Sequence, residues 1–246
     1  MQHRSKKIKK SFFIILVVLI VWSGGSAIYL GNYYHSVDVE KYMNGSSEVS
    51  VEKFDKGWFF DGAGEEKALI FYPGAKVATE AYAPLMYQLT ENGIDCFLVD
   101  MPFHMAFFGM NRAEEIMQEY NYEAWYLGGH SLGGAMAANF AADYVEDHTD
   151  GIRGLLLLAA YPTKDLSTSD MSVVTVYGSE DGVLNMDKIV AGRELMPQDY
   201  KEVCIEGGNH AQFGSYGAQK GDGTAAIPAE EQWARTVEVF VGDESE

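Results

Sequence analysis

The stretch of sequence that decides the fold is AWYLGGHSLGGAMAA, residues 124–138. A short apolar run leads to a serine between glycines, and small residues of helical character follow. Gly129, Ser131 and Gly133 form the G-x-S-x-G pattern of a nucleophile elbow, a strained turn between a strand and a helix. Residues two positions either side of the serine must lack bulk for such a turn to form. The alternative is an ordinary strand-to-helix turn without a chemical role.

Strand-like and helix-like segments alternate along the rest of the chain. Residues 68–72 are continuously apolar, which is typical of a strand buried on both faces. Residues 49–60 alternate around a turn and indicate an antiparallel hairpin at a sheet edge. Together the segments predict an α/β fold, with a mostly parallel sheet and helices on both faces. The other expected strands are 95–99, 154–159, 173–177 and 201–205, and the expected helices are 80–92, 113–120, one from the elbow to about 144, and 229–241.

A serine hydroxyl becomes a nucleophile when a neighbouring base removes its proton, and a carboxylate orients that base. After a nucleophile elbow, the acid and then the histidine follow the serine along the chain. His210 meets this order in the glycine-containing loop EGGNHAQF, residues 206–213. His130 is constrained inside the elbow, and His104 precedes the serine. The order therefore favours His210 as the base, with a structural loop histidine as the alternative.

The acid is expected in the loop after the strand at 173–177, which offers Glu180 and Asp181. Asp181 is favoured because Gly182 and Val183 let the loop turn inward, whereas Glu180 is expected to face solvent. The alternative is a solvated turn residue.

A tetrahedral oxyanion requires two backbone donors. One is expected from the N–H of Leu132, directly after the serine. The second is expected from Ala75, with Lys76 as the alternative, because Pro73-Gly74 lets the backbone approach closely. An ordinary turn is again the competing interpretation.

A loop rich in aromatic residues and methionine, MPFHMAFFGM at 101–110, follows a strand at the same edge. Phe103, His104 and Phe107 are predicted to line an apolar substrate pocket, with core packing as an equally supported alternative. Only residues 160–172 separate two successive strands at the connection where lids usually enter, so no cap domain is expected.

Composition narrows the possible partners. The net charge is −18, and five of the 18 basic residues lie within the first ten positions, so the body is more acidic still. Such a body is not expected to bind nucleic acid and is repelled by anionic surfaces. The sequence shows none of the spacings of metal sites, so neither a metal nor a cofactor is expected. Cys96 and Cys204 lie in apolar runs and are expected to be two buried free thiols.

The amino terminus has the pattern of a membrane-targeting segment. Basic residues lead into an uncharged segment from Ser11 to Tyr34, long enough for a helix across a bilayer. We expect residues 1–30 to form an uncleaved membrane anchor, 31–47 a tether and 48–246 the catalytic domain outside the cytoplasm. The alternative is a signal peptide cleaved near Gly25-Ser26-Ala27, which would leave a secreted protein.

From about residue 49 to residue 241 the chain resembles the α/β-hydrolase superfamily, and more narrowly the compact bacterial members related to dienelactone hydrolases. This resemblance implies Ser131 as nucleophile, Asp181 as acid and His210 as base. It also implies a strand order that keeps Cys96 and Cys204 apart. Dienelactone hydrolase uses cysteine where this chain has serine. The matching stretches are FYPGAKV at 71–77, MPF at 101–103, GHSLGG at 129–134 and GGNHAQFG at 207–214.

These features lead to one functional expectation and two alternatives. The expected activity is that of a carboxylesterase-like serine hydrolase (EC 3.1), which cleaves a small-molecule ester or related acyl bond through an acyl-enzyme. One alternative is a non-catalytic extracytoplasmic binding protein on the same fold. The other is an acyltransferase, which the absence of a lid disfavours because transfer requires that water be excluded.

Overall fold

The computed structural model describes residues 31–64, 66–148 and 151–243. The expected hydrophobic helix at residues 1–30 lies outside these ranges and stays a prediction. Within them, no helix combines the length and the apolar character needed to cross a membrane. From Tyr34 onward the chain forms one compact unit, Tyr34–Glu246.

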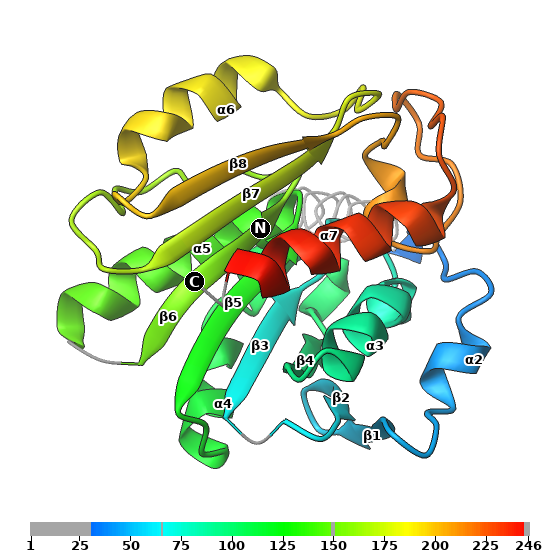
Figure 1. Ribbon diagram of the computed structural model, residues 1–246, viewed down its shortest axis with the longest axis horizontal. Coiled ribbons are helices and arrows are strands. Elements are labelled where there is room, and N and C mark those ends of the chain that lie inside the picture. Colours follow the sequence, from blue (N-terminus) through cyan, green and yellow to red (C-terminus); the bar gives the residue numbers. More distant parts are fainter. Residues whose placement is uncertain (1–30, 65, 149–150, 244–246) are drawn as a thin grey trace, which may run out of the picture. The chain divides into compact units, whose positions relative to one another are not determined.

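The described part of the chain contains a single sheet of eight strands in the order β1-β2-β4-β3-β5-β6-β7-β8 (Figure 1). The hairpin β1–β2 and the pair β2–β4 are antiparallel, and all other neighbours are parallel. The carboxyl ends of β3 to β8 therefore meet at one edge. The strands are β1 (Ser50–Phe54), β2 (Gly57–Asp61), β3 (Lys67–Tyr72), β4 (Asp95–Val99), β5 (Ala124–His130), β6 (Ile152–Leu158), β7 (Ser172–Gly178) and β8 (Tyr200–Ile205).

Helices connect the strands and cover the sheet. In Figure 1, α3 and α7 lie side by side over the face nearer the viewer, and α5 lies behind the sheet. The α-helices are α2 (Glu40–Met43), α3 (Ala83–Glu91), α4 (Arg112–Glu119), α5 (Leu132–Asp147), α6 (Met186–Gly192) and α7 (Ala229–Asp243). The short 3-10 helices are η1 (Thr79–Tyr82), η2 (Pro102–His104), η3 (Ala106–Phe108), η4 (Arg193–Leu195) and η5 (Ala211–Phe213).

The central strand β3 shows why the core has two layers. Leu69 and Phe71 belong to the hydrophobic cluster that contains residues of α3 and α7, whereas Ile70 and Tyr72 belong to the cluster that contains residues of α4 and α5. All four side chains are buried. A strand whose side chains alternate between two covered faces must be apolar throughout, and the predicted run at 68–72 is therefore confirmed.

The structure confirms the α/β fold with helices on both faces of a mostly parallel sheet. Every expected strand is present, and the hairpin β1–β2 turns at Asp55-Lys56, directly before Gly57, whose φ of +156° suits glycine. Residues 159–171 join β6 to β7 without a helix, so no cap covers the carboxyl edge. The helix expected at 80–92 begins as η1 and becomes α3 at Ala83, with Pro84 in the first turn, where its missing N–H is tolerated.

Two expectations require correction. The segment 31–47 was predicted to be a tether, but from Tyr34 it belongs to the compact unit, and the side chain of Val39 is buried in the core. Cys96 is buried as predicted, whereas Cys204 is exposed, because it lies on the edge strand β8, which has a neighbour on one side only. Both cysteines are free, and their strands β4 and β8 are far apart in the sheet order, as the resemblance implies.

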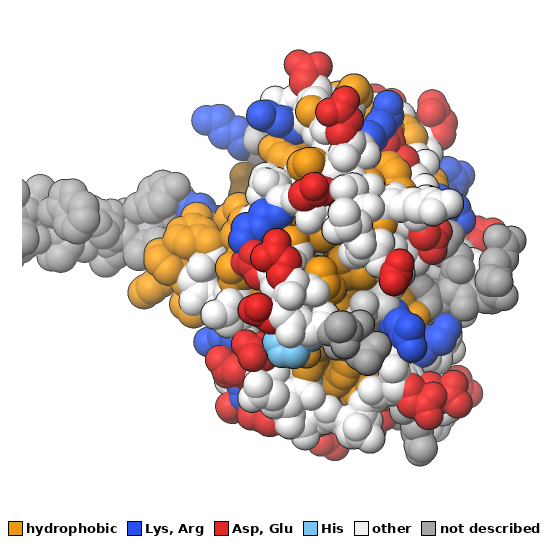
Figure 2. All heavy atoms as spheres, turned by 90° about the vertical axis from the view of Figure 1, so that its left-hand side faces the viewer, with side chains coloured by type: hydrophobic (Ala, Val, Ile, Leu, Met, Phe, Trp, Pro, Cys, Tyr) orange, Lys and Arg blue, Asp and Glu red, His pale blue; other side chains and the backbone are white. Residues whose placement is uncertain are grey.

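The surface reflects the acidic composition. Figure 2 shows one face of the molecule, on which acidic side chains are widely scattered with Lys and Arg among them. Hydrophobic side chains gather toward one margin of the same view. Acidic side chains are thus spread over this face of the body, while its exposed apolar side chains are concentrated toward one margin.

Candidate active site

The turn at Ser131 joins the end of β5 to the start of α5. Its backbone has φ +55° and ψ −122°, a conformation that costs a non-glycine residue roughly 1–3 kcal/mol. The glycines on both sides make this turn possible. A Cβ at Gly133 would lie 2.1 Å from the carbonyl oxygen of Tyr72, and one at Gly129 would lie 2.6 Å from the carbonyl carbon of Gly133. Ser131 is therefore presented at the carboxyl edge by a strained, closely packed turn.

The loops after β7 and β8 bring Asp181 and His210 together. Nδ1 of His210 lies 2.8 Å from Oδ2 of Asp181, and their side chains are 1% and 2% exposed. Oδ1 of Asp181 accepts hydrogen bonds of 2.8 Å from the N–H groups of Val183 and Leu184. Because the carboxylate accepts these bonds, Nδ1 of His210 carries the shared proton, and Nε2 is left with its lone pair.

This geometry distinguishes between Glu180 and Asp181, the two candidates for the acid. Glu180 is exposed and accepts a hydrogen bond from Ser179, while Asp181 contacts the histidine. Nε2 of His210 is buried and forms no hydrogen bond with any described residue. Ser131 thus forms no hydrogen bond to Nε2 in this structure, although the ring of the adjoining His130 lies 4.4 Å from the ring of His210. Catalytic hydrogen bonds are often formed only when substrate binds.

Asp222 contacts both loops of the site and is not predicted from the sequence. Its Oδ1 accepts hydrogen bonds from the N–H groups of Gly182 at 3.1 Å and His210 at 3.2 Å. Its Oδ2 accepts a 2.8 Å hydrogen bond from the N–H of Ala211. One carboxylate therefore joins the loop of Asp181 to the loop of His210. The only signal in the sequence is an aspartate between two glycines at 221–223, which could equally be a surface turn.

The loop after β3 contains Ala75 and Lys76, the two candidates for the second oxyanion donor. Gly74 donates its N–H to Oη of Tyr82 at 3.0 Å, and Oη lies 2.7 Å from Nδ1 of His130. Lys76 adopts a left-handed φ of +58° and donates its N–H to the carbonyl of His104. The N–H of Ala75 makes no hydrogen bond to the backbone of the described residues.

Leu132 lies in the first turn of α5, where backbone N–H groups have no acceptor within the helix. The positive end of the helix dipole favours negative charge at this point. The roles of Leu132 and Ala75 as donors to an oxyanion stay predictions.

His130, which is not expected to act as the base, lies between Tyr82 on one side and His210 on the other. Burial, followed by the neighbouring His210, holds the pKa of His130 well below its usual value. The ring is consequently neutral, so Nδ1 can accept the hydrogen bond of the Tyr82 hydroxyl. The side chains of Tyr82 and His130 therefore connect the loop of Gly74 to the surroundings of His210.

The loop at 101–110 places its aromatic rings outward. Phe103 is 57% exposed and Phe107 is 48% exposed, so neither packs in the core. Phe103 and His104 have consecutive left-handed φ values of +57° and +54°. His104 is partly buried against the loop of Lys76 and Val77, and burial lowers the pKa of His104. That Phe103, His104 and Phe107 line a substrate pocket stays a prediction, while the exposure of Phe103 and Phe107 argues against the alternative of core packing.

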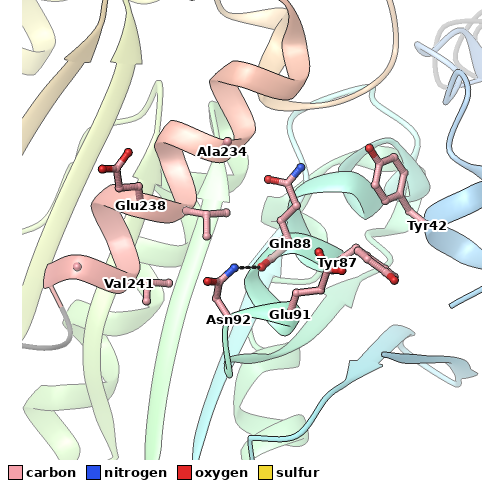
Figure 3. A pocket seen from close by; sticks show the side chains of 10 residues that line it. Tyr42, Tyr87, Gln88, Glu91, Asn92, Ala234, Glu238 and Val241 are labelled. Atoms are coloured by element: carbon pink, nitrogen blue, oxygen red, sulfur yellow. Dashed lines mark hydrogen bonds between the residues drawn. The ribbon is translucent and has the colours of Figure 1, made fainter. Parts of the chain in front are cut away.

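A separate groove of about 750 Å³ lies between α3 and α7, with α2 at one end (Figure 3). Tyr42 and Tyr87 lie at that end, and Ala234 and Glu238 of α7 face them across the hollow. The lining residues include no serine, cysteine or histidine, so the groove is not a candidate for nucleophilic chemistry. In the described ranges, no group of three His, Cys, Asp or Glu side chains could hold a metal ion.

A lidless parallel sheet with a serine elbow at its carboxyl edge defines a hydrolase of the α/β class. The model of the alpha/beta hydrolase family matches residues 68–234, which is most of the chain. The chain therefore belongs to the alpha/beta hydrolase family. A comparison with curated proteins finds no match.

Solved structures share this fold at low sequence identity. Est1E from Butyrivibrio proteoclasticus aligns with a TM-score of 0.55 at 16% identity, covering 81% of this chain and 100% of that one. Carboxyl esterase 2 from the mycorrhizal fungus Tuber melanosporum aligns with a TM-score of 0.60 at 12% identity, covering 85% and 89%. The Paleococcus ferrophilus monoacylglycerol lipase aligns with a TM-score of 0.57 at 14% identity, covering 80% and 99%. At these identities the likeness concerns the fold.

Proposed function

We propose that this hydrolase is a carboxylesterase-like serine hydrolase that acts through an acyl-enzyme. The observation that carries the proposal is the buried pair of Asp181 and His210, joined at 2.8 Å, at the same sheet edge as the strained turn of Ser131. A buried carboxylate that holds one nitrogen of a histidine leaves the other nitrogen free to act as a base. The short connection between β6 and β7 leaves this edge open to water, which favours hydrolysis.

In the proposed reaction, Nε2 of His210 removes the proton of the Ser131 hydroxyl as Oγ attacks the ester carbonyl carbon. The carbonyl π electrons move to oxygen, and the N–H groups of Ala75 and Leu132 stabilise the resulting oxyanion. When the carbonyl re-forms, the alkoxide leaves with the proton from His210. Water, deprotonated by His210, then attacks the acyl-enzyme, and Ser131 recovers its proton as the carboxylic acid departs.

An ester substrate is supported by the chemistry of the nucleophile and by the neighbours in structure. Serine with a neutral histidine base is suited to acyl transfer from esters. Proteins of the same fold are described as esterases and a monoacylglycerol lipase, and we extend that activity class to this chain. No metal or cofactor takes part in the proposed steps.

For the location, we propose that residues 1–30 remain as a membrane anchor and that the hydrolase body lies outside the cytoplasm. The support is the uncharged segment from Ser11 to Tyr34 behind a basic amino terminus. The mass of the mature protein tests this proposal. A species that lacks the first 27 residues would contradict the anchor and favour secretion after cleavage.

Labelling with a fluorophosphonate tests the activity directly, because this probe bonds covalently to an activated serine. We expect the wild type to be labelled and Ser131→Ala to be unlabelled. Ser167→Ala is a matched control, since Ser167 is an exposed serine in the connection between β6 and β7. Equal labelling of wild type and Ser131→Ala would contradict the assignment. A folded wild type that is not labelled would favour a non-catalytic binding protein.

A further inference from the structure

Large hydrophobic side chains are exposed in an uneven pattern. Of the seven such residues in the described part of the chain, Val190 lies in the middle of α6. The other six lie in the segments that follow the carboxyl ends of β4 and β7 or, for Val37, beside Ser215; Met186 is the first residue of α6. We name these six the apolar rim; they are Val37, Phe103, Phe107, Phe108, Val183 and Met186, with exposures of 39–57%. Grouped apolar exposure of this kind marks an interaction surface.

The aromatic part of the rim is held in place by the fold. The rings of Phe107 and Phe108 lie 4.1 Å apart between centroids, and the rings of Phe103 and Phe108 lie 5.6 Å apart. Backbone hydrogen bonds close both turns of the loop, from His104 to Met101 and from Phe108 to Met105. The left-handed backbone at Phe103 is thus maintained while its side chain stays 57% exposed.

The rim lies close to the end of the uncharged amino-terminal segment. Tyr34 pairs with Val77 beside the proposed oxyanion loop, through hydrogen bonds between Tyr34 and Lys76 at 2.7 Å and between Ala78 and Tyr34 at 2.8 Å. Lys76 is bonded in turn to His104 of the aromatic loop. Tyr34 lies four positions after Leu30, and four residue steps of chain span at most about 14 Å. Covalent connection therefore keeps the active edge near any membrane that holds residues 11–30.

Val37 extends the rim to the other side of the proposed site. It donates its N–H to Ser215 and accepts a hydrogen bond from the Ser215 hydroxyl, five residues beyond His210. Val183 and Met186 lie two and five positions after Asp181. The apolar side chains consequently flank the elements that carry the acid and the base, as well as the oxyanion loop.

We propose that the apolar rim docks on the lipid bilayer that holds the amino-terminal segment, and that the substrate is a membrane-resident acyl ester. The inference rests on the proposed function and on the proposed anchor. The acidic body excludes attraction to anionic headgroups, so docking depends on apolar insertion and is strongest on zwitterionic lipid. The substrate then reaches Ser131 from the bilayer and does not have to cross water.

Fluorescence quenching tests the docking without reference to activity. The full chain with Trp22→Phe, which keeps Trp58, Trp125 and Trp233, is reconstituted in phosphatidylcholine vesicles whose acyl chains carry bromine, and its own quenching is subtracted as the background. A tryptophan is introduced by Phe108→Trp at the rim or by Asn121→Trp, an exposed control in the loop that leads into β5 at the opposite edge. We expect at least twofold stronger quenching at position 108 than at position 121. Equal quenching would overturn the proposal.

Hydrolysis of two esters tests the substrate class. Phe108→Ser is the informative variant, because Phe108 is not among the residues predicted to line the substrate pocket. We expect it to lower the hydrolysis of a monoacylglycerol in the same vesicles at least fivefold, while hydrolysis of water-soluble p-nitrophenyl acetate stays within twofold of wild type. Equal loss on both esters would place Phe108 in the active site and overturn the proposal.

Two further outcomes distinguish failure of the docking proposal from failure of the proposed hydrolase function, and lipid from a second copy of the chain as the group that covers the rim. If the wild type hydrolyses neither ester, the proposed function fails, whereas the quenching result still decides whether the rim meets lipid. If the solubilised chain is a dimer that dissociates in Phe108→Ser, and position 108 is not quenched, a second copy covers the rim and the proposal is overturned.

Discussion

Replacing Tyr82 by phenylalanine tests whether the hydrogen bonds behind the oxyanion loop matter for catalysis. The substitution removes one hydroxyl, which accepts the N–H of Gly74 at 3.0 Å and lies 2.7 Å from Nδ1 of His130. Tyr82 and His130 are both buried, so water does not replace the lost partner. The ring itself and its packing against Phe71 remain.

The expected magnitude follows from the groups left without partners. A buried donor or acceptor that loses its hydrogen bond costs about 1–3 kcal/mol, so the two groups together lower the free energy of unfolding by roughly 2–6 kcal/mol. At about 2–4 °C per kcal/mol for a domain of this size, the melting temperature falls by roughly 4–24 °C. Loss of the Gly74 hydrogen bond also frees the loop that carries Ala75, and we expect kcat to fall about 10- to 100-fold.

Tyr72→Phe is the matched control. The Tyr72 hydroxyl is also buried, accepts a backbone N–H from Ala113 at 3.1 Å and donates to the carbonyl of Met110, but these bonds lie on the α4 side of the sheet. Thermal unfolding and steady-state kinetics on a soluble ester are measured for both variants. We expect similar losses of stability and a selective loss of kcat in Tyr82→Phe. Equal kcat values in the two variants would refute the reasoning.

Three further predictions concern the rest of the site and the edge of the sheet. Asp222→Ala should lower kcat about tenfold or more with little change in KM, because it removes the carboxylate that joins the loops of Asp181 and His210. Asp222→Asn should recover part of the lost kcat. A kcat of Asp222→Ala within twofold of wild type would contradict this role. Gly133→Ala should destabilise the fold by about 3 kcal/mol in urea unfolding, since its Cβ would meet backbone atoms at 2.1 and 2.4 Å, whereas Gly242→Ala, which meets open space, should be nearly neutral. The hydrogen bonds from Arg193 lower the pKa of Glu202, so this stabilisation is complete above the unfolded pKa of about 4.3 and is lost as the pH falls through the lower folded value. Melting temperatures measured from pH 7 to pH 3 should therefore fall more steeply for wild type than for Glu202→Gln, and parallel curves would contradict this coupling.

The central strands could be predicted because burial on two faces leaves no freedom in composition. The apolar run at 68–72 and the strand at 95–99 match β3 and β4 within one residue for this reason. The helix α6 was not anticipated, since most of its side chains are exposed and the sequence shows little apolar periodicity there. The exposure of Cys204 escaped prediction because whether a strand lies at an edge depends on pairing between distant segments.

Some residues of the candidate site can be predicted from the sequence and others cannot. Ser131, Asp181 and His210 stand out in the sequence because each follows an apolar strand, and parallel strands bring their carboxyl ends to one edge. Asp222 and the pair Tyr82 and His130 do not stand out, since the hydrogen bonds that tie them to other loops are made with residues 8 to 48 positions away. Contacts of that kind exist only after the loops have been placed by the fold.

By itself, then, the sequence determined the α/β class, the strained turn at Ser131 and the order of the acid and base loops. Local patterns of burial, glycine and chain order are sufficient for these. The tertiary structure alone decided that Asp181 and not Glu180 contacts His210, that Asp222 joins the two loops, and that the rings of Phe103, Phe107 and Phe108 face outward. The physical reason is that side-chain direction and hydrogen-bond partners depend on the relative placement of loops, which the packing of the whole sheet sets.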